Sequence, residues 1–298
     1  MYQAFWGLRE RPFELTPNPK FLFFSARHRE ALSTLEYGLA AAKSLTVLLG
    51  DVGTGKTSLI RAALESDRCR HVRCITISNP ALTRDEFITM LAARCGLPAE
   101  AGRSKAVLLE ELERVLTMRR ARGEVMALIV DEAQRLEPSL LEEIRLLGNL
   151  ETATEKLLPL VLVGQPEFDE QLEAPSMRQV KQRVALRCVL TPFELNDTAA
   201  CIAHRISSAG GTPAEVFTLE AVTTIHEIAR GIPRAISVLC DNALMCAMAQ
   251  DRKPVDHEMV LEVARDFALY VPQGPTSFAA APSVLEPPRR FSLFRRAR

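Results

Sequence analysis

The residue string with the clearest chemical meaning is GDVGTGKT at residues 50–57, a full match to the pattern G-x-x-x-x-G-K-[ST]. Glycines at these spacings let successive backbone N–H groups converge on phosphate oxygens, and a following helix adds the positive end of its dipole. Lys56 would reach the β and γ phosphates of a nucleotide, while the Thr57 hydroxyl would bind Mg²⁺. The candidate ATP-binding residues are Gly50, Asp51, Val52, Gly53, Thr54, Gly55, Lys56, Thr57 and Ser58.

Two adjacent carboxylates follow an apolar run about 70 residues further along the chain. Asp131 and Glu132 come directly after Leu128-Ile-Val130, at the end of an expected buried strand, where an unpaired charge is costly. Asp131 is therefore a candidate ATP-site residue and Mg²⁺ ligand, and Glu132 a candidate base that orients and deprotonates an attacking water. An ordinary turn at a strand end would explain the pair alone, but its combination with the loop at 50–57 favours hydrolysis of MgATP.

The elements that must position these residues alternate between strands and helices. Short apolar runs predict strands, and apolar residues at helical spacing predict the helices between them. The strands are expected at 45–49, 71–78, 125–131, 158–164 and 184–190, and the helices at 26–43, 57–66, 83–95, 105–122 and 138–151. This alternation is typical of crossover units and predicts an α/β fold with a mostly parallel sheet.

The strand signal ends near Pro192, and four helices are expected beyond it, at 194–209, 218–230, 233–250 and 255–268. Thr218, Pro233 and Asp256 mark the starts of the last three. Residues 1–24 are rich in proline and aromatic residues, so we expect an extended arm that packs its rings onto the domain. The predicted organisation is an arm at 1–24, an α/β core at 25–192, a small helical lid at 193–270 and a disordered tail at 271–298.

Composition excludes several classes of protein. The 298 residues are 47% hydrophobic and 25% charged, which is typical of a soluble globular chain. The net charge is zero, so the chain as a whole lacks the positive charge that is typical of nucleic-acid-binding proteins. Residues 271–298 carry a net charge of about +4, and residues 1–270 carry about −4. Seven scattered cysteines without a C-x-x-C pair favour a reduced compartment over disulfides or a zinc site. The chain shows no signal peptide or membrane span, so we expect a cytoplasmic protein.

The two motifs resemble the Walker A and Walker B elements of AAA+ ATPases. More narrowly, the chain resembles the ATPase domain of the general secretion pathway protein A (ExeA-like) family, which is related to transposition-regulator ATPases. The narrower resemblance covers about residues 1–270. It rests on the strings MY, FWGL, PF, DEAQ, VGQPE, QR and GIPR, which begin at residues 1, 5, 12, 131, 163, 182 and 231.

This resemblance implies a three-layer P-loop core with a five-stranded parallel sheet, followed by a helical lid, and it assigns three further roles. Gln165 matches a sensor that contacts the γ-phosphate or the attacking water, although a polar strand cap is the alternative. Arg183 matches the arginine finger that a neighbouring subunit supplies, with Arg178 and Arg187 as rivals. Arg234 matches a second sensor on the lid, with a solvated arginine at a helix start as the alternative.

The resemblance also implies a homo-oligomer that ATP forms or stabilises, and a task in energising or regulating a bacterial envelope assembly or secretion system for protein, pili or polysaccharide. The alternative is a DNA-binding ATPase of the transposition-regulator class. A scaffold without enzymatic activity has no need of a water-activating carboxylate such as Glu132. The arginine-rich end at 289–298 could contact the inner membrane peripherally, a protein partner or nucleic acid, although a solvated tail is favoured.

Overall fold

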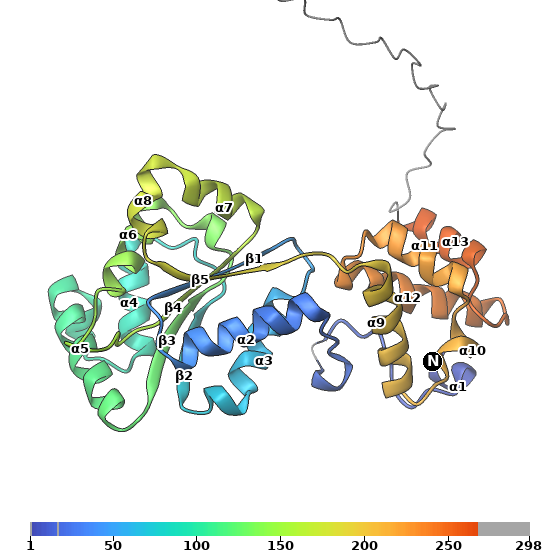
Figure 1. The fold of residues 1–298 in the computed structure, drawn as a ribbon, viewed down its shortest axis with the longest axis horizontal. Helices are drawn as coiled ribbons and strands as arrows, with labels where there is room; N and C mark the ends of the chain where they lie inside the picture. The colour runs from blue at the N-terminus through green and yellow to red at the C-terminus, as the bar shows by residue number, and fades with distance from the viewer. Residues whose placement is uncertain (1, 17, 268–298) are drawn as a thin grey trace, which may run out of the picture.

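The computed structural model describes residues 2–16 and 18–267 of the 298-residue chain. Figure 1 shows two bodies, a layered α/β domain and a bundle of helices, with the strand β5 leading from the first into the second. The predicted disordered tail at 271–298 lies outside the described residues. Among the residues that are described, no helix is both long and apolar enough to cross a membrane.

The α/β domain contains one sheet in which all five strands are parallel, as the sequence predicted. Its strands are β1 (Leu45–Gly50), β2 (Val72–Ile77), β3 (Val125–Val130), β4 (Leu160–Gly164) and β5 (Val184–Leu190), in the order β2-β3-β4-β1-β5. Every residue of β1, β3 and β4 is buried. Their continuous apolar sequences follow from this position, because helices cover both faces of the sheet.

Helices on the two faces complete three layers (Figure 1). One face carries α2 (Ala26–Ala40) and α3 (Lys56–Glu65), and the other carries α4 (Arg84–Arg94), α5 (Lys105–Ala121) and α6 (Pro138–Leu147). The predicted helices are found, although α6 stops four residues before its predicted end. Two short helices that the sequence analysis did not assign, α7 (Pro166–Glu173) and α8 (Arg178–Lys181), join β4 to β5.

The second body consists of α9 (Leu195–Ser208), α10 (Pro213–Val216), α11 (Leu219–Ala229), α12 (Pro233–Ala249) and α13 (His257–Asp266). Thr218 caps α11 by accepting a hydrogen bond from the backbone N–H of Ala221, and Asp256 caps α13 in the same way from Met259. Pro233 occupies the first turn of α12. Helices α11, α12 and α13 therefore begin at the predicted residues Thr218, Pro233 and Asp256. The short helix α10 was not predicted.

The N-terminal segment packs its aromatic rings into this helical body. It forms a short helix, α1 (Tyr2–Trp6), and a single 3₁₀ turn, η1 (Pro19–Phe21), where the sequence predicted only an extended arm. Trp6 is buried and donates a hydrogen bond to the carbonyl of Leu244 in α12 (3.1 Å), and Phe13 packs edge-to-face on Phe217. The expected docking of the rings thus occurs on the helical body of the same chain.

The parallel sheet decides which loops can meet. In register, Leu49 of β1 lies beside Gly164 of β4, and Val130 of β3 lies beside Leu162 of β4. The loops that follow β1, β3 and β4 therefore leave the same edge of the sheet, where the carboxyl ends of the strands lie. Arg183 precedes β5 and so lies at the opposite edge.

Candidate functional site

The loop between β1 and α3 is a tight turn that requires its glycines. Gly53 and Gly55 have φ values of 83° and 100°, in the left-handed region that residues with side chains rarely adopt. A Cβ atom on Gly50 would lie 2.8 Å from the hydroxyl of Thr54. Helix α3 starts at Lys56, so its positive end faces the loop.

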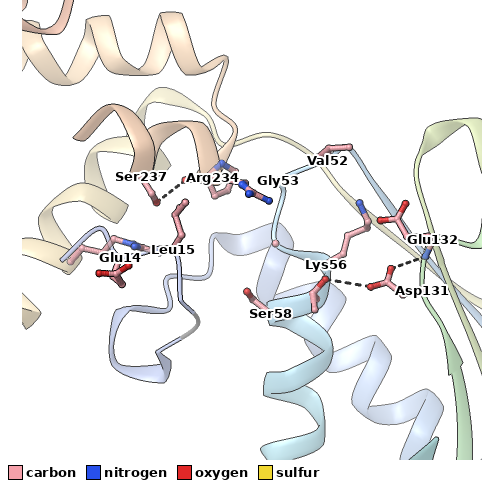
Figure 2. A pocket seen from close by; sticks show the side chains of 14 residues that line it. Glu14, Leu15, Val52, Gly53, Lys56, Ser58, Asp131, Glu132, Arg234 and Ser237 are labelled. Carbon is pink, nitrogen blue, oxygen red and sulfur yellow. Dashed lines mark hydrogen bonds between the residues drawn. The ribbon is translucent and has the colours of Figure 1, made fainter. Parts of the chain in front are cut away.

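Lys56 lies at the centre of this loop. Its side chain is buried, and Nζ donates hydrogen bonds to the carbonyls of Gly50 (2.7 Å) and Asp51 (3.0 Å). Burial lowers the pKa of the ammonium group, and the negative charges of Asp131 and Glu132 oppose that shift. In Figure 2 the side chain extends from the loop toward the strand end that carries these two carboxylates. The geometry suits an ammonium group that neutralises phosphate oxygens.

Thr57, in the first turn of α3, and Asp131, directly after β3, approach each other. The hydroxyl of Thr57 donates to Oδ2 of Asp131 over 3.4 Å, and the backbone N–H of Glu132 donates to Oδ1 over 2.9 Å (Figure 2). Burial raises the pKa of the Asp131 carboxyl above its ordinary value. A hydroxyl and a carboxylate oxygen at this separation fit Mg²⁺, which takes few protein ligands and completes its shell with water and phosphate oxygens.

Glu132 is held in a strained backbone conformation with a fixed carboxylate. Its φ and ψ are 56° and 40°, which are uncommon for a residue with a side chain. Its Oε2 atom accepts hydrogen bonds from the side-chain amides of Gln134 (2.6 Å) and Gln165 (3.2 Å). The backbone N–H of Gln165 in turn donates to Oε1 of Gln134 (3.2 Å). The structure thus brings Gln165 to Glu132, and it adds Gln134, to which the sequence analysis gave no role.

The loop at 50–57, Asp131 and Glu132 border a cleft of about 380 Å³, the size of a small-molecule site. The loop and the two carboxylates form one wall, and Pro233, Arg234 and Ser237 from α12 form the other. Arg205 of α9 and the arm residues Glu14 and Leu15 complete the lining. The sequence analysis missed these last three, because only tertiary packing brings the arm and α9 to the loop.

The helical body contacts the loop directly, and Arg234 lies at this contact. Its backbone N–H donates to the carbonyl of Gly53 (3.2 Å). A Cβ atom on Gly53 would lie 3.0 Å from side-chain atoms of both Arg234 and Ile232. The helical body therefore packs directly against the loop at 50–57, called the phosphate loop below.

Arg183 does not join this cleft. It lies partly buried at the opposite edge of the sheet, where its guanidinium makes one long contact to the carbonyl of Gly148 (3.5 Å). Of its rivals, Arg187 forms an ion pair with Asp169 (2.6 Å), and Arg178 is exposed at the start of α8. A role for Arg183 in hydrolysis would require a second copy of the chain.

His28 is a further residue that the sequence analysis left without a role in the site. It is buried in the first turn of α2, and its Nε2 atom lies 2.9 Å from the carbonyl of Thr54 in the phosphate loop. The signal in the sequence was weak, because 26 residues separate the two partners. Within the residues that the structure describes, no group of three or more His, Cys, Asp and Glu side chains forms a metal site.

Sequence comparison places the loop at 50–57 and the Asp131–Glu132 pair within a known domain. A profile of the AAA domain matches residues 40–172. General secretion pathway protein A of Aeromonas hydrophila is 39% identical over 257 residues, which are 86% of this chain and 47% of that protein. The Mu-like prophage FluMu DNA transposition protein B of Haemophilus influenzae is 27% identical over 224 residues, 74% of this chain and 71% of that protein. The chain thus spans about half the length of the first of these relatives.

Solved structures show the same fold. The ORC2 protein of Aeropyrum pernix, in its ADPNP–ADP complexes, has a TM-score of 0.63 at 16% identity, with 86% of this chain and 71% of that chain covered. The Cdc6p protein of Pyrobaculum aerophilum has a TM-score of 0.63 at 20% identity, with coverages of 86% and 70%. At such identities the likeness establishes the architecture, and it confirms the predicted P-loop fold with its five-stranded parallel sheet and helical region.

The contact between loop and lid gives a testable prediction at Gly53. Gly53→Ala should weaken binding of a fluorescent ATP analogue at least about tenfold, equivalent to about 1.4 kcal/mol, because the added methyl group displaces the lid residues Ile232 and Arg234. Gly123→Ala is the matched control. That glycine also has a positive φ (78°), but an added Cβ would meet nothing within 4 Å. Equal affinities of the two variants would contradict a lid contact that shapes the loop.

Proposed function

This chain belongs to the AAA+ P-loop family and is related to general secretion pathway protein A, and from that premise we propose that it binds and hydrolyses MgATP. One observation supports the proposal above the others. The buried ammonium group of Lys56 lies in the same cleft as the Asp131–Glu132 pair, and Arg234 of the helical body lies beside the same loop. A triphosphate supplies the anionic groups that such an arrangement is suited to bind.

The proposed roles follow from the positions of the side chains. Loop N–H groups and Lys56 would hold the phosphates, and Thr57 and Asp131 would hold Mg²⁺, which would neutralise charge that develops on the phosphate oxygens. Glu132 receives the proton of the attacking water. Gln165 and Gln134 donate to the Glu132 carboxylate and so fix its direction before the water arrives.

The client of this ATPase is proposed from its relative. General secretion pathway protein A is named for a secretion pathway, and the chain matches about half of that protein. We propose that hydrolysis changes the shape of a homo-oligomer that energises or regulates an envelope assembly or secretion system, for protein, pili or polysaccharide. The basic segment at 289–298 is the candidate for peripheral contact with the inner membrane, a proposal that rests on its composition.

Glu132→Gln tests the assignment of the base. The variant should bind ATP as the unaltered chain does but release phosphate at least about 100-fold more slowly, because an amide cannot take the proton of the water. Phosphate release and titration with a fluorescent ATP analogue measure the two steps separately. Lys56→Ala provides the reference for lost binding, since it removes the phosphate-binding charge. If Glu132→Gln released phosphate at the rate of the unaltered chain, Glu132 would not be the base.

The position of Arg183 predicts action between subunits. Arg183→Ala should lower turnover about 10³-fold or more, as for other arginine fingers, without weakening ATP binding. Mixing it with Lys56→Ala should restore phosphate release, because an intact nucleotide site of one variant then meets an intact arginine of the other. Arg187→Ala, which removes an exposed, ion-paired arginine, serves as the control. No recovery at any mixing ratio would contradict a finger at Arg183.

The alternative function is a DNA-binding ATPase, and the similarity to a transposition protein B favours it. The net charge of about −4 over residues 1–270 argues against this alternative, because it disfavours a wide surface that binds the phosphate backbone of DNA. In the presence of ATP, we expect only weak binding to random-sequence duplex, and none once the five tail arginines are replaced by glutamine. Tight binding by that variant, falling steeply between two salt concentrations, would establish the alternative.

A further inference from the structure

His28 lies outside the cleft lining, yet it contacts the phosphate loop from behind. Its side chain is only 3% exposed, and each ring nitrogen has one polar partner. Nε2 lies 2.9 Å from the carbonyl oxygen of Thr54, and Nδ1 lies 2.9 Å from the hydroxyl of Ser25. The ring thus bridges the start of α2 and the loop that precedes α3.

The two partners fix the tautomer of the ring. A carbonyl oxygen can only accept a hydrogen bond, so Nε2 must carry the proton. In the neutral ring Nδ1 then accepts from the Ser25 hydroxyl, whose oxygen also caps α2 by accepting from the backbone N–H of His28 (3.4 Å). Burial lowers the pKa of His28, which agrees with a neutral ring.

The bonded carbonyl controls a peptide group of the phosphate loop. Because a trans peptide is planar, its C=O and N–H bonds point in opposite directions. The imidazole holds the Thr54 carbonyl on the α2 side, and the N–H of Gly55 therefore points away from α2. Gly55 itself lines the cleft. With a φ of 100°, this glycine would otherwise be free to turn, so the direction of its N–H depends on an outside contact.

The ring also packs against the connection to the lid. Its centroid lies 5.2 Å from that of Phe193, a residue between β5 and α9, and 6.3 Å from that of Phe24. Phe193 donates its backbone N–H to the carbonyl of Gly231 (2.8 Å), just before α12. A Cβ on Gly231 would lie only 2.1 Å from the Phe193 carbonyl, so the lid backbone approaches this position very closely.

We propose that His28 is a positioning residue for nucleotide binding. It orients the Thr54–Gly55 peptide toward the phosphates, and its packing on Phe193 makes that orientation depend on the placement of the lid. The inference rests on the proposed ATP-binding function and extends it to a residue that does not touch the nucleotide. Removing the Nε2 donor should weaken binding of the triphosphate, and a side chain with a donor at the same distance should restore it.

The experiment compares His28→Leu with His28→Gln, whose amide nitrogen can replace Nε2 as a donor to Thr54. We expect His28→Leu to weaken binding of a fluorescent ATP analogue at least about tenfold, and His28→Gln to lie within about threefold of the unaltered chain. The rise in the unfolding midpoint on saturation with ATP should shrink in the leucine variant and remain in the glutamine variant.

His226→Leu is the matched control. Its ring accepts or donates a hydrogen bond at Thr198 within the helical body (2.9 Å) but has no contact with the loop. It should lower the unfolding midpoint and leave ATP affinity unchanged. Should His28→Leu fail to fold, Ser25→Ala takes its place, with the capping variant Thr83→Ala of α4 as control for the lost helix cap. Ser25→Ala should then bind ATP at least about threefold more weakly than Thr83→Ala.

The outcomes separate this inference from the proposed function. Failure of the unaltered chain to bind ATP would overturn the proposed function and this inference with it. ATP affinity that survives His28→Leu unchanged, or a glutamine variant as weak as the leucine variant, would overturn the role of His28 alone.

Discussion

The direction of a few peptide groups in the loop at 50–57 is the constraint on which the site depends. Glycines make the turn possible, but they also make it free to move, so other residues must hold it. Lys56 bonds the carbonyls of Gly50 and Asp51, His28 bonds that of Thr54, and Arg234 bonds that of Gly53. With the Thr54 carbonyl held on the α2 side, the planar Thr54–Gly55 peptide leaves the N–H of Gly55 for the cleft.

A second constraint is the burial of charge at the carboxyl ends of the strands. Burial raises the pKa of Asp131, because a carboxylate there loses water as its partner. The Thr57 hydroxyl, the N–H of Glu132 and the ammonium of Lys56 offset part of that cost. For Glu132, two glutamine amides hold the carboxylate. The site is therefore a set of charges that local hydrogen bonds hold near one another and that a divalent cation with phosphates would complete.

Sequence patterns predicted the parts of this structure that follow from local rules. Strands such as β1 and β3 are buried on both faces and so appear as unbroken apolar runs, and Thr218 and Asp256 cap helices with their own side chains. Contacts between distant segments leave no such pattern. Leu15 reaches the cleft only because the arm packs into the helical body, and His28 gives no motif in a stretch that predicts an ordinary amphipathic helix.

Under the proposed function, the packing of the helical lid would couple nucleotide binding to the shape of the chain. The arm rings and α9 to α13 share one apolar core, and a close-packed core moves as a unit. Arg234 of this unit donates its backbone N–H to the carbonyl of Gly53 in the phosphate loop. A second, indirect contact runs from Phe193 to the ring of His28 in α2, which bonds the carbonyl of Thr54. Displacing the lid therefore changes partners of loop carbonyls, and a ligand that fixes the loop must in return favour one lid position.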